Sequence, residues 1–330
     1  LRSYAAPLNM QNPPLLPPRF FSHLKLLFLL LTGPMLAGHA AEPPALIVVI
    51  SLDQFRQDYL EKFRPYFSAG GFNLFLNRGT AFTNCHYRHS LTKTGPGHAV
   101  LLSGVHANIH GIIANDWIDR NTFVRVNCVD DPSVEVLGLA ESTGGVRMPG
   151  SKAMIGRSPK NYLVTTVGDE LKAERGGQPR IIGISNKDRA AVLMGGQLAS
   201  AAYYTEGAHF VSSTYYMKEL PQWVRDFNAA GKQDAYFGRV WDRVLPVEAY
   251  AIQGPDDSPG EFTGLGLGRT FPKTVTGGDA KPGANFYETL IHTPFASEIL
   301  ADFARAAIEN ENLGRRGVTE EAAVVGHVQL

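Results

Sequence analysis

Cysteine, net charge and long apolar runs are all scarce in this sequence. The 330 residues contain only two cysteines, Cys85 and Cys128, without a Cys-x-x-Cys spacing, which excludes a structural zinc knuckle. The 31 lysines and arginines are balanced by 31 aspartates and glutamates, so the formal net charge is zero. Because nucleic-acid-binding surfaces carry an excess of basic residues, this balance argues against nucleic acid as the main partner.

An apolar run near the N-terminus is too short to cross a membrane, which takes about 20 residues. Arg19 and Lys25 precede the run Leu26–Leu31, and the small residues of Ala37–Ala41 follow it. This order predicts a secretory signal peptide within residues 1–41, and hence a secreted or periplasmic protein without a stable membrane anchor. In that oxidising compartment the two cysteines could pair, a question that the sequence leaves open. A buried N-terminal helix is the alternative.

Apolar, β-branched runs alternate with segments of helical spacing. Ala45–Ser51 is an unbroken run of this kind, which is typical of a strand buried on both faces of a parallel sheet. We expect further strands at Thr80–Cys85 and Arg180–Ser185. Helices are expected at residues 56–63, 72–76 and 165–172, and from Thr293-Pro294 onward. This alternation predicts an α/β fold.

The composition changes between residues 195 and 287, where aromatic residues are frequent and a long stretch is rich in glycine and proline. We interpret 195–287 as a cap inserted into the α/β core. The core would occupy residues 42–194 and resume at 288–330, after an N-terminal extension and signal peptide at 1–41.

Two glycines and a proline stand just before the apolar run that ends at Gly104, which predicts a loop turning into a helix. Pro96 suits the first helical position, so Thr94 would lie at or just before the N-cap. The unpaired N–H groups and the positive end of the helix dipole would favour an anion there. A hydroxyl at that place could attack a phosphoryl group, although Thr94 also fits a simple helix cap.

Other polar side chains follow strands or loops of the predicted sheet. Asp53 comes directly after the first strand, Asn115 ends a loop, and Lys187 and Arg189 follow the strand at 180–185. A carboxylate at a strand end can bind a metal ion, and a divalent cation would activate a threonine hydroxyl that is otherwise a poor nucleophile. In an extended segment Lys187 and Arg189 would point to one side and suit a dianionic phosphate. A solvated surface turn is the alternative for this pair.

Several segments resemble the alkaline phosphatase superfamily. They are Val48–Gln54, Thr94–His98, Ile109–Trp117, Asn186–Arg189, Ser212–Met217 and His292–Phe295. In particular, they resemble the secreted, phosphate-irrepressible bacterial alkaline phosphatases of the PafA type, which are similar in turn to nucleotide pyrophosphatases/phosphodiesterases. The resemblance covers residues 46–314 in collinear order.

The resemblance implies an α/β fold of alkaline-phosphatase type: a three-layer sandwich with a mostly parallel sheet and an inserted cap. It implies zinc-dependent hydrolysis of small phosphate monoesters, with two Zn²⁺ ions and a phosphothreonine intermediate. By position, Asp53 would be a zinc ligand and Thr94 the zinc-bound nucleophile. Asn115, Lys187 and Arg189 would bind the non-bridging phosphate oxygens, and the Lys-x-Arg pair resembles the monoesterase branch. We expect a monomer.

Histidines are concentrated around the Thr94 turn, at His86, His89, His98, His106 and His110. Gly104 and Gly111 bracket a predicted loop that holds the last two. The related family uses none of these histidines as a metal ligand, so we interpret them as core or supporting residues.

The sequence departs from the family after residue 314. The family has an Asp-x-x-Gly-His pattern there, then an Asp-His pair and a last histidine, all zinc ligands. Here Ala323 stands where the aspartate would precede Gly326-His327, and the later ligands are absent. Since zinc takes about four ligands, we expect the fold to be incomplete at the C-terminus and this chain to be inactive as written. A phosphodiesterase or nucleotide pyrophosphatase, and a non-catalytic phosphate-binding protein, are the alternatives.

Overall fold

The structure is a computed structural model that describes residues 43–139, 155–261, 263–315, 317 and 321–329, the last segment by its backbone alone. Pro44–Leu330 cluster as one compact unit. The predicted signal peptide at 1–41 lies outside the described residues. Within the described ranges, no helix has both the length and the apolar character needed to cross a membrane.

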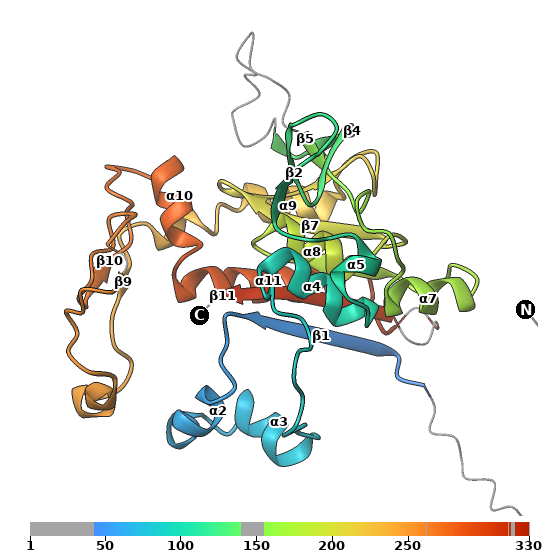
Figure 1. Cartoon of the computed structure of the whole chain (residues 1–330). Helices are drawn as coiled ribbons and strands as arrows, with labels where there is room; N and C mark the ends of the chain where they lie inside the picture. The colour runs from blue at the N-terminus through green and yellow to red at the C-terminus, as the bar shows by residue number, and fades with distance from the viewer. Residues whose placement is uncertain (1–42, 140–154, 262, 316, 318–320, 330) are drawn as a thin grey trace, which may run out of the picture. The chain divides into compact units, whose positions relative to one another are not determined.

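A seven-stranded sheet in the order β1-β11-β6-β7-β8-β4-β5 forms the centre of this unit (Figure 1). Its strands are β1 (Leu46–Asp53), β4 (Asp130–Leu137), β5 (Ile155–Arg157), β6 (Ile181–Ile184), β7 (Ala201–Glu206), β8 (His209–Ser213) and β11 (Glu321–Gln329). The first four strands in this order, β1, β11, β6 and β7, run parallel to one another. The remaining strands, β8, β4 and β5, continue the sheet in antiparallel pairs. The sheet is therefore mixed, and its parallel half begins with the β-branched run that the sequence identified.

Smaller elements complete the described chain. Two short antiparallel pairs join β2 (Asp116–Ile118) to β3 (Arg125–Asn127) and β9 (Val240–Trp241) to β10 (Lys273–Thr274). The α-helices are α2 (Tyr59–Lys62), α3 (Phe72–Arg78), α4 (Thr94–Ser103), α5 (Ala107–His110), α7 (Val167–Glu174), α8 (Asp188–Gly195), α9 (Gln222–Ala229), α10 (Ala284–Leu290) and α11 (Pro294–Asn310). The 3₁₀ turns are η1 (Arg64–Tyr66), η2 (Asp234–Tyr236) and η3 (Val247–Gln253).

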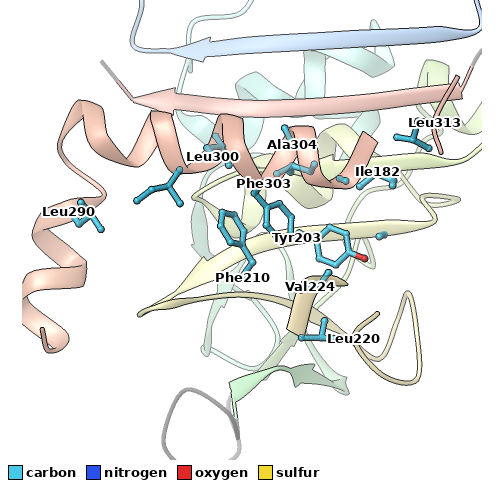
Figure 2. Packing of buried hydrophobic residues seen from close by; sticks show 14 of the residues in the cluster. Ile182, Tyr203, Phe210, Leu220, Val224, Leu290, Leu300, Phe303, Ala304 and Leu313 are labelled. Atoms are coloured by element: carbon cyan, nitrogen blue, oxygen red, sulfur yellow. The ribbon is translucent and has the colours of Figure 1, made fainter. Parts of the chain in front are cut away.

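Helices cover both faces of the sheet and pack against it through two separate cores. Side chains along β7 alternate between these two cores. Tyr203 belongs to the core under α9, α10 and α11, where Phe303 stacks on Phe210 with ring centroids 3.8 Å apart (Figure 2). Tyr204, the next residue, belongs to the core under α4 and α8, together with Val192. Each fully buried aromatic or branched side chain contributes about 2–3 kcal/mol. This is the three-layer α/β sandwich that the sequence predicted.

The helix α8 lies unusually close to β6. A Cβ added to Gly183 of β6 would overlap the carbonyl oxygen of Ala191 in α8, so only glycine permits this approach. The contact fixes where α8 starts relative to the carboxyl end of β6, which is the place where parallel sheets carry their sites.

The sequence-based expectations were wrong at three places. Thr80–Cys85 is irregular and exposed, since no strand or core of the described residues stabilises an extended conformation there. The helix α4 begins at Thr94 itself with Lys93 as N-cap, so Pro96 is its third residue and not its first. A short helix, α5, occupies the segment expected to be a loop before Gly111.

The predicted cap begins inside the sheet. Both β7 and β8 fall within 195–287, yet they are central strands, so the sheet continues past the expected core boundary at residue 194. The interpretation of the remainder of 195–287 as a cap stays a prediction.

Candidate functional site

The carboxyl end of β1 presents Asp53 to the first residue of α4. The Thr94 hydroxyl donates to Oδ2 of Asp53 at 3.0 Å, and the backbone N–H of Gln54 donates to Oδ1 at 2.9 Å. Gln54 has φ of 63°, a left-handed conformation that costs a non-glycine residue about 1–2 kcal/mol. Such strain is concentrated at functional sites, and here it ends the strand with its carboxylate directed at Thr94.

Thr94 is held in place by His98, one helical turn further along α4. Nδ1 of His98 donates to the carbonyl oxygen of Thr94 at 2.8 Å, and its Nε2 lies 3.3 Å from Oγ of Ser51 on β1. A carbonyl can only accept, so Nδ1 carries a proton. His98 is 3% exposed and links the helix to the strand, in keeping with the supporting role expected for it.

Asn115 caps the start of the same helix. Its Oδ1 accepts the N–H of Gly95 at 2.7 Å, and its own carbonyl oxygen accepts the N–H of Cys128 at 2.9 Å. The expectation that free N–H groups of this helix would bind phosphate is narrowed to the Thr94 amide, because Asn115 occupies the Gly95 amide, Pro96 has none and the Gly97 N–H donates to Lys93. With its oxygen engaged, Asn115 offers its side-chain NH₂ as a further donor to an anion at this turn.

Cys128 packs beneath the first turn of α4. A Cβ added to Gly95 would lie 3.1 Å from both Cys128 Sγ and Asn115 Oδ1, so the glycine allows this close packing. Burial raises the pKa of the Cys128 thiol to about 12, which keeps it neutral. Cys85 and Cys128 are both free thiols, exposed and buried respectively, so the disulfide that the sequence left open is not formed.

Lys187 and Arg189 flank the first residue of α8 and do not lie in an extended segment. Asp188 begins the helix with Lys187 as N-cap, because the backbone turns as soon as β6 ends. The charge of Arg189 opposes the effect of burial on the pKa of the Cys128 thiol. The charge of Lys187 acts on Glu206, at the end of β7.

The expected site residues are therefore brought together to different degrees. Asp53, Thr94 and Asn115 form hydrogen bonds around the start of α4, and, among the described residues, Arg189 is linked to this group only by the effect of its charge on Cys128. In the part of the chain that the structure describes, Lys187 has no recorded contact with Thr94 or Asn115. These observations say where the residues lie and assign a role to none of them.

Sequence reasoning missed Arg157, the last residue of β5. Its Nε donates to Oδ2 of Asp188 at 2.6 Å, although the two residues are 31 positions apart. No local pattern signals such a partner, because it comes from a hairpin at the other end of the sheet.

The described residues do not complete a zinc centre. Asp53 and Thr94 contribute two oxygen atoms, whereas zinc takes about four ligands, and no three His, Cys, Asp or Glu residues in the described ranges lie close enough to hold a metal ion. The backbone of β11 pairs with the end of β1, Gly326 opposite Ser51 and Gln329 opposite Asp53. His327 is the extra residue of a bulge in this pairing.

Comparison with known proteins identifies the family. The family model "Type I phosphodiesterase / nucleotide pyrophosphatase" matches residues 47–255. The chain is 36% identical over 283 residues to a calcium-transporting ATPase of Myroides odoratus, and 36% identical over 285 residues to the alkaline phosphatase PhoV of Synechococcus elongatus. Each alignment covers 85% of this chain and 49% of the relative. The chain thus spans about half the length of the curated relatives it matches.

Solved structures agree with this result. The crystal structure of the alkaline phosphatase PafA is 31% identical, has a TM-score of 0.75, and is matched over 87% of this chain and 53% of that one. A second PafA structure, 30% identical with the same TM-score, has a threonine replaced by serine and an asparagine, a lysine and an arginine replaced by alanine. The resemblance to the alkaline phosphatase superfamily and the expected fold are confirmed. The chain belongs to the type I phosphodiesterase/nucleotide pyrophosphatase family.

Proposed function

We propose that this chain carries the nucleophile and the phosphate-binding residues of a phosphoester hydrolase of alkaline phosphatase type, with small phosphate monoesters as substrates. The observation that carries the proposal is the 3.0 Å hydrogen bond from the Thr94 hydroxyl to Asp53, at a helix start capped by Asn115. A hydroxyl is thereby held at a fixed place next to an amide donor.

The substituted PafA structure supports the assignment of roles. Its four altered residues have the same types and the same order as Thr94, Asn115, Lys187 and Arg189. The spacing between the threonine and the asparagine, and between the lysine and the arginine, is also the same in the two chains. We therefore propose that these four residues surround one phosphoryl group.

In the proposed reaction, Oγ of Thr94 attacks phosphorus, the Thr–O–P bond forms as the ester P–O bond breaks, and the ester oxygen leaves as an alkoxide that takes a proton from water. The hydroxyl proton leaves along its hydrogen bond to Asp53, and water later hydrolyses the phosphothreonine. The Arg189 fork and the Asn115 NH₂ would bind non-bridging oxygens, and Lys187 would add positive charge.

Two Zn²⁺ ions, with Asp53 and Thr94 among their ligands, are the further part of this proposal. The described residues do not by themselves complete such a centre, so no step here depends on a metal ion. A threonine hydroxyl without an activating group is a poor nucleophile. For the 330-residue polypeptide we therefore expect phosphate binding without turnover.

The test combines binding and turnover in one set of variants. Titration calorimetry with inorganic phosphate should show binding that Arg189→Ala weakens about 10- to 100-fold, since a hydrogen bond to a charged group contributes about 1.5–3 kcal/mol. Arg305→Ala removes an equal charge from an exposed position of α11 and should have no effect. Aryl phosphate turnover in zinc that disappears with Thr94→Ala would contradict the expected inactivity. Equal phosphate affinity of the wild type and Arg189→Ala would contradict the site.

Phosphodiester hydrolysis is the second candidate, because the matching family model is described by that activity. A diester carries one negative charge and a second substituent, whereas the Lys187 and Arg189 charges suit a dianion. Competition against bound phosphate decides between the two: an aryl phosphate should displace phosphate at lower concentration than a bis-aryl phosphate. The reverse order would favour the diesterase.

The proposed compartment is secreted or periplasmic, on the basis of the predicted signal peptide alone. Expression in a bacterium should release a product into the periplasm whose N-terminus lies near residue 42. A product that keeps residues 19–41 in the cytoplasm would contradict this location.

A further inference from the structure

Arg157 is a largely buried guanidinium held between two carboxylates. Its Nε donates to Asp188 Oδ2 at 2.6 Å, and its Nη1 contacts Asp130 and donates to the carbonyl oxygen of Ile155 at 2.9 Å. The side chains of Arg157, Asp188 and Asp130 are 16%, 13% and 23% exposed. Burial alone would lower the pKa of Arg157, but the charges of Asp188 and Asp130 raise it, so the guanidinium stays protonated.

The carboxylate of Asp188 connects this guanidinium to the start of α8. Its Oδ1 accepts the backbone N–H of Arg189 at 2.7 Å while its Oδ2 faces Arg157. The preceding turn is held separately, because Ser185 Oγ accepts the N–H of Lys187 at 3.0 Å. Through its ion pair with Asp188, Arg157 thus stabilises the start of α8. This start carries Lys187 and Arg189, the two cations proposed to bind phosphate.

The Asp188 carboxylate can compete with the phosphate for the side chain of Arg189. Nε of Arg189 already forms a long ion pair with Oδ1 of Asp188, but the 3.5 Å distance is too great for a good hydrogen bond, and this buried nitrogen has no hydrogen-bond partner among the described residues. A small rotation of the Asp188 carboxylate would close that gap. The hydrogen bond from Arg157 to the other oxygen opposes such a rotation.

We infer that Arg157 is a positioning residue of the phosphate site: it holds Asp188 against itself and so leaves the Arg189 guanidinium for the phosphoryl oxygens. This inference rests on the proposed function, because it assumes that Arg189 binds phosphate. Without Arg157, Asp188 would shorten its long ion pair with Arg189 into a hydrogen bond and so compete with the phosphate for that guanidinium.

Titration calorimetry with inorganic phosphate on the full chain tests the inference through a double-mutant cycle. Arg157→Met should weaken phosphate binding about 10-fold or more, the effect of losing one charged hydrogen bond. Arg157→Met combined with Asp188→Asn should restore the affinity to within about threefold of the wild type, because the competing carboxylate is gone. A residue that merely stabilised the fold would give no such rescue, since the double variant loses the same ion pair. Arg305→Met is the matched control and should bind like the wild type.

Asp188→Asn alone keeps the inference testable if Arg157→Met does not fold. It should bind phosphate at least as tightly as the wild type, whereas a loss of about 10-fold or more would overturn the inference. Unchanged affinity in Arg157→Met, or a double variant no better than the single one, would overturn it as well. Arg189→Ala distinguishes failure of the proposed function from failure of this inference. If Arg189→Ala leaves the phosphate affinity unchanged, the proposed function fails. If it abolishes phosphate binding while Arg157→Met does not weaken binding, only this inference fails.

Discussion

The close packing around Gly95 gives a sharp prediction for stability. In Gly95→Ala the new Cβ would lie 3.1 Å from Asn115 Oδ1, 3.1 Å from Cys128 Sγ and 3.3 Å from the carbonyl oxygen of Ala114. All three neighbours would have to move by a few tenths of an ångström, and overpacking of this kind costs about 1–3 kcal/mol. Alanine also gains about 0.5–1 kcal/mol over glycine in a helix. The net change should lie between about zero and 2.5 kcal/mol of destabilisation.

Gly97→Ala is the matched control, two residues further along the same helix. Its added Cβ meets no atom within 4 Å, so the variant should be stabilised by the helix term of about 0.5–1 kcal/mol alone. Urea denaturation of both variants isolates the packing term, because their unfolded chains change in the same way. The two free energies of unfolding should differ by about 1–3 kcal/mol. Equal stabilisation of both variants would refute the packing described around Asn115 and Cys128.

Three further predictions concern the surrounding fold. Gly183→Ala should destabilise the chain by about 1–3 kcal/mol or more in the same assay, since its Cβ would overlap a carbonyl oxygen of α8. An unchanged urea midpoint of unfolding would contradict that contact. Burial alone would raise the pKa of Asp131, but hydrogen bonds from Ser133 and Ser158 hold it at about 2. Asp131→Asn should therefore cost about 2 kcal/mol at pH 7, and this cost should disappear between about pH 4 and pH 2; a constant difference would be evidence against the shift. Burial lowers the pKa of His110, so the free energy of unfolding should fall as the pH drops below about 6.5, less steeply in His110→Gln. Identical pH profiles of the wild type and His110→Gln would show that His110 does not cause this pH dependence.

The parts of the fold that the sequence predicted are those set by local pattern. Leu46–Asp53 is a strand, as its β-branched run predicts, but the expected burial on both faces is wrong. It is the edge strand of the described sheet, and Val48 and Ile50 are exposed. The helix at Thr94 and the helix after Thr293 follow from glycine, proline and apolar spacing. That Asp53 and Thr94 lie together followed from the family resemblance, because the strand expected before Thr94 is not formed.

The errors occurred where a partner distant in sequence decides the structure. Thr80–Cys85 has the composition of a strand but no neighbour among the described residues to pair with, so propensity alone was misleading. Lys187 and Arg189 were expected in an extended segment, but the α8 helix starts between them, supported by an arginine 31 residues earlier. Asn115 was expected to bind phosphate, and the sequence gives no sign that its oxygen first caps α4.

A crystal structure of the chain grown with inorganic phosphate tests the central claim most directly. The account predicts one phosphate at the start of α4, within hydrogen-bond distance of the Thr94 hydroxyl, the Asn115 NH₂ and the Arg189 guanidinium. The Asp188 carboxylate should remain on Arg157 in that structure. A phosphate bound elsewhere, with Arg189 hydrogen-bonded to Asp188 and the Thr94 site without an anion, would contradict it.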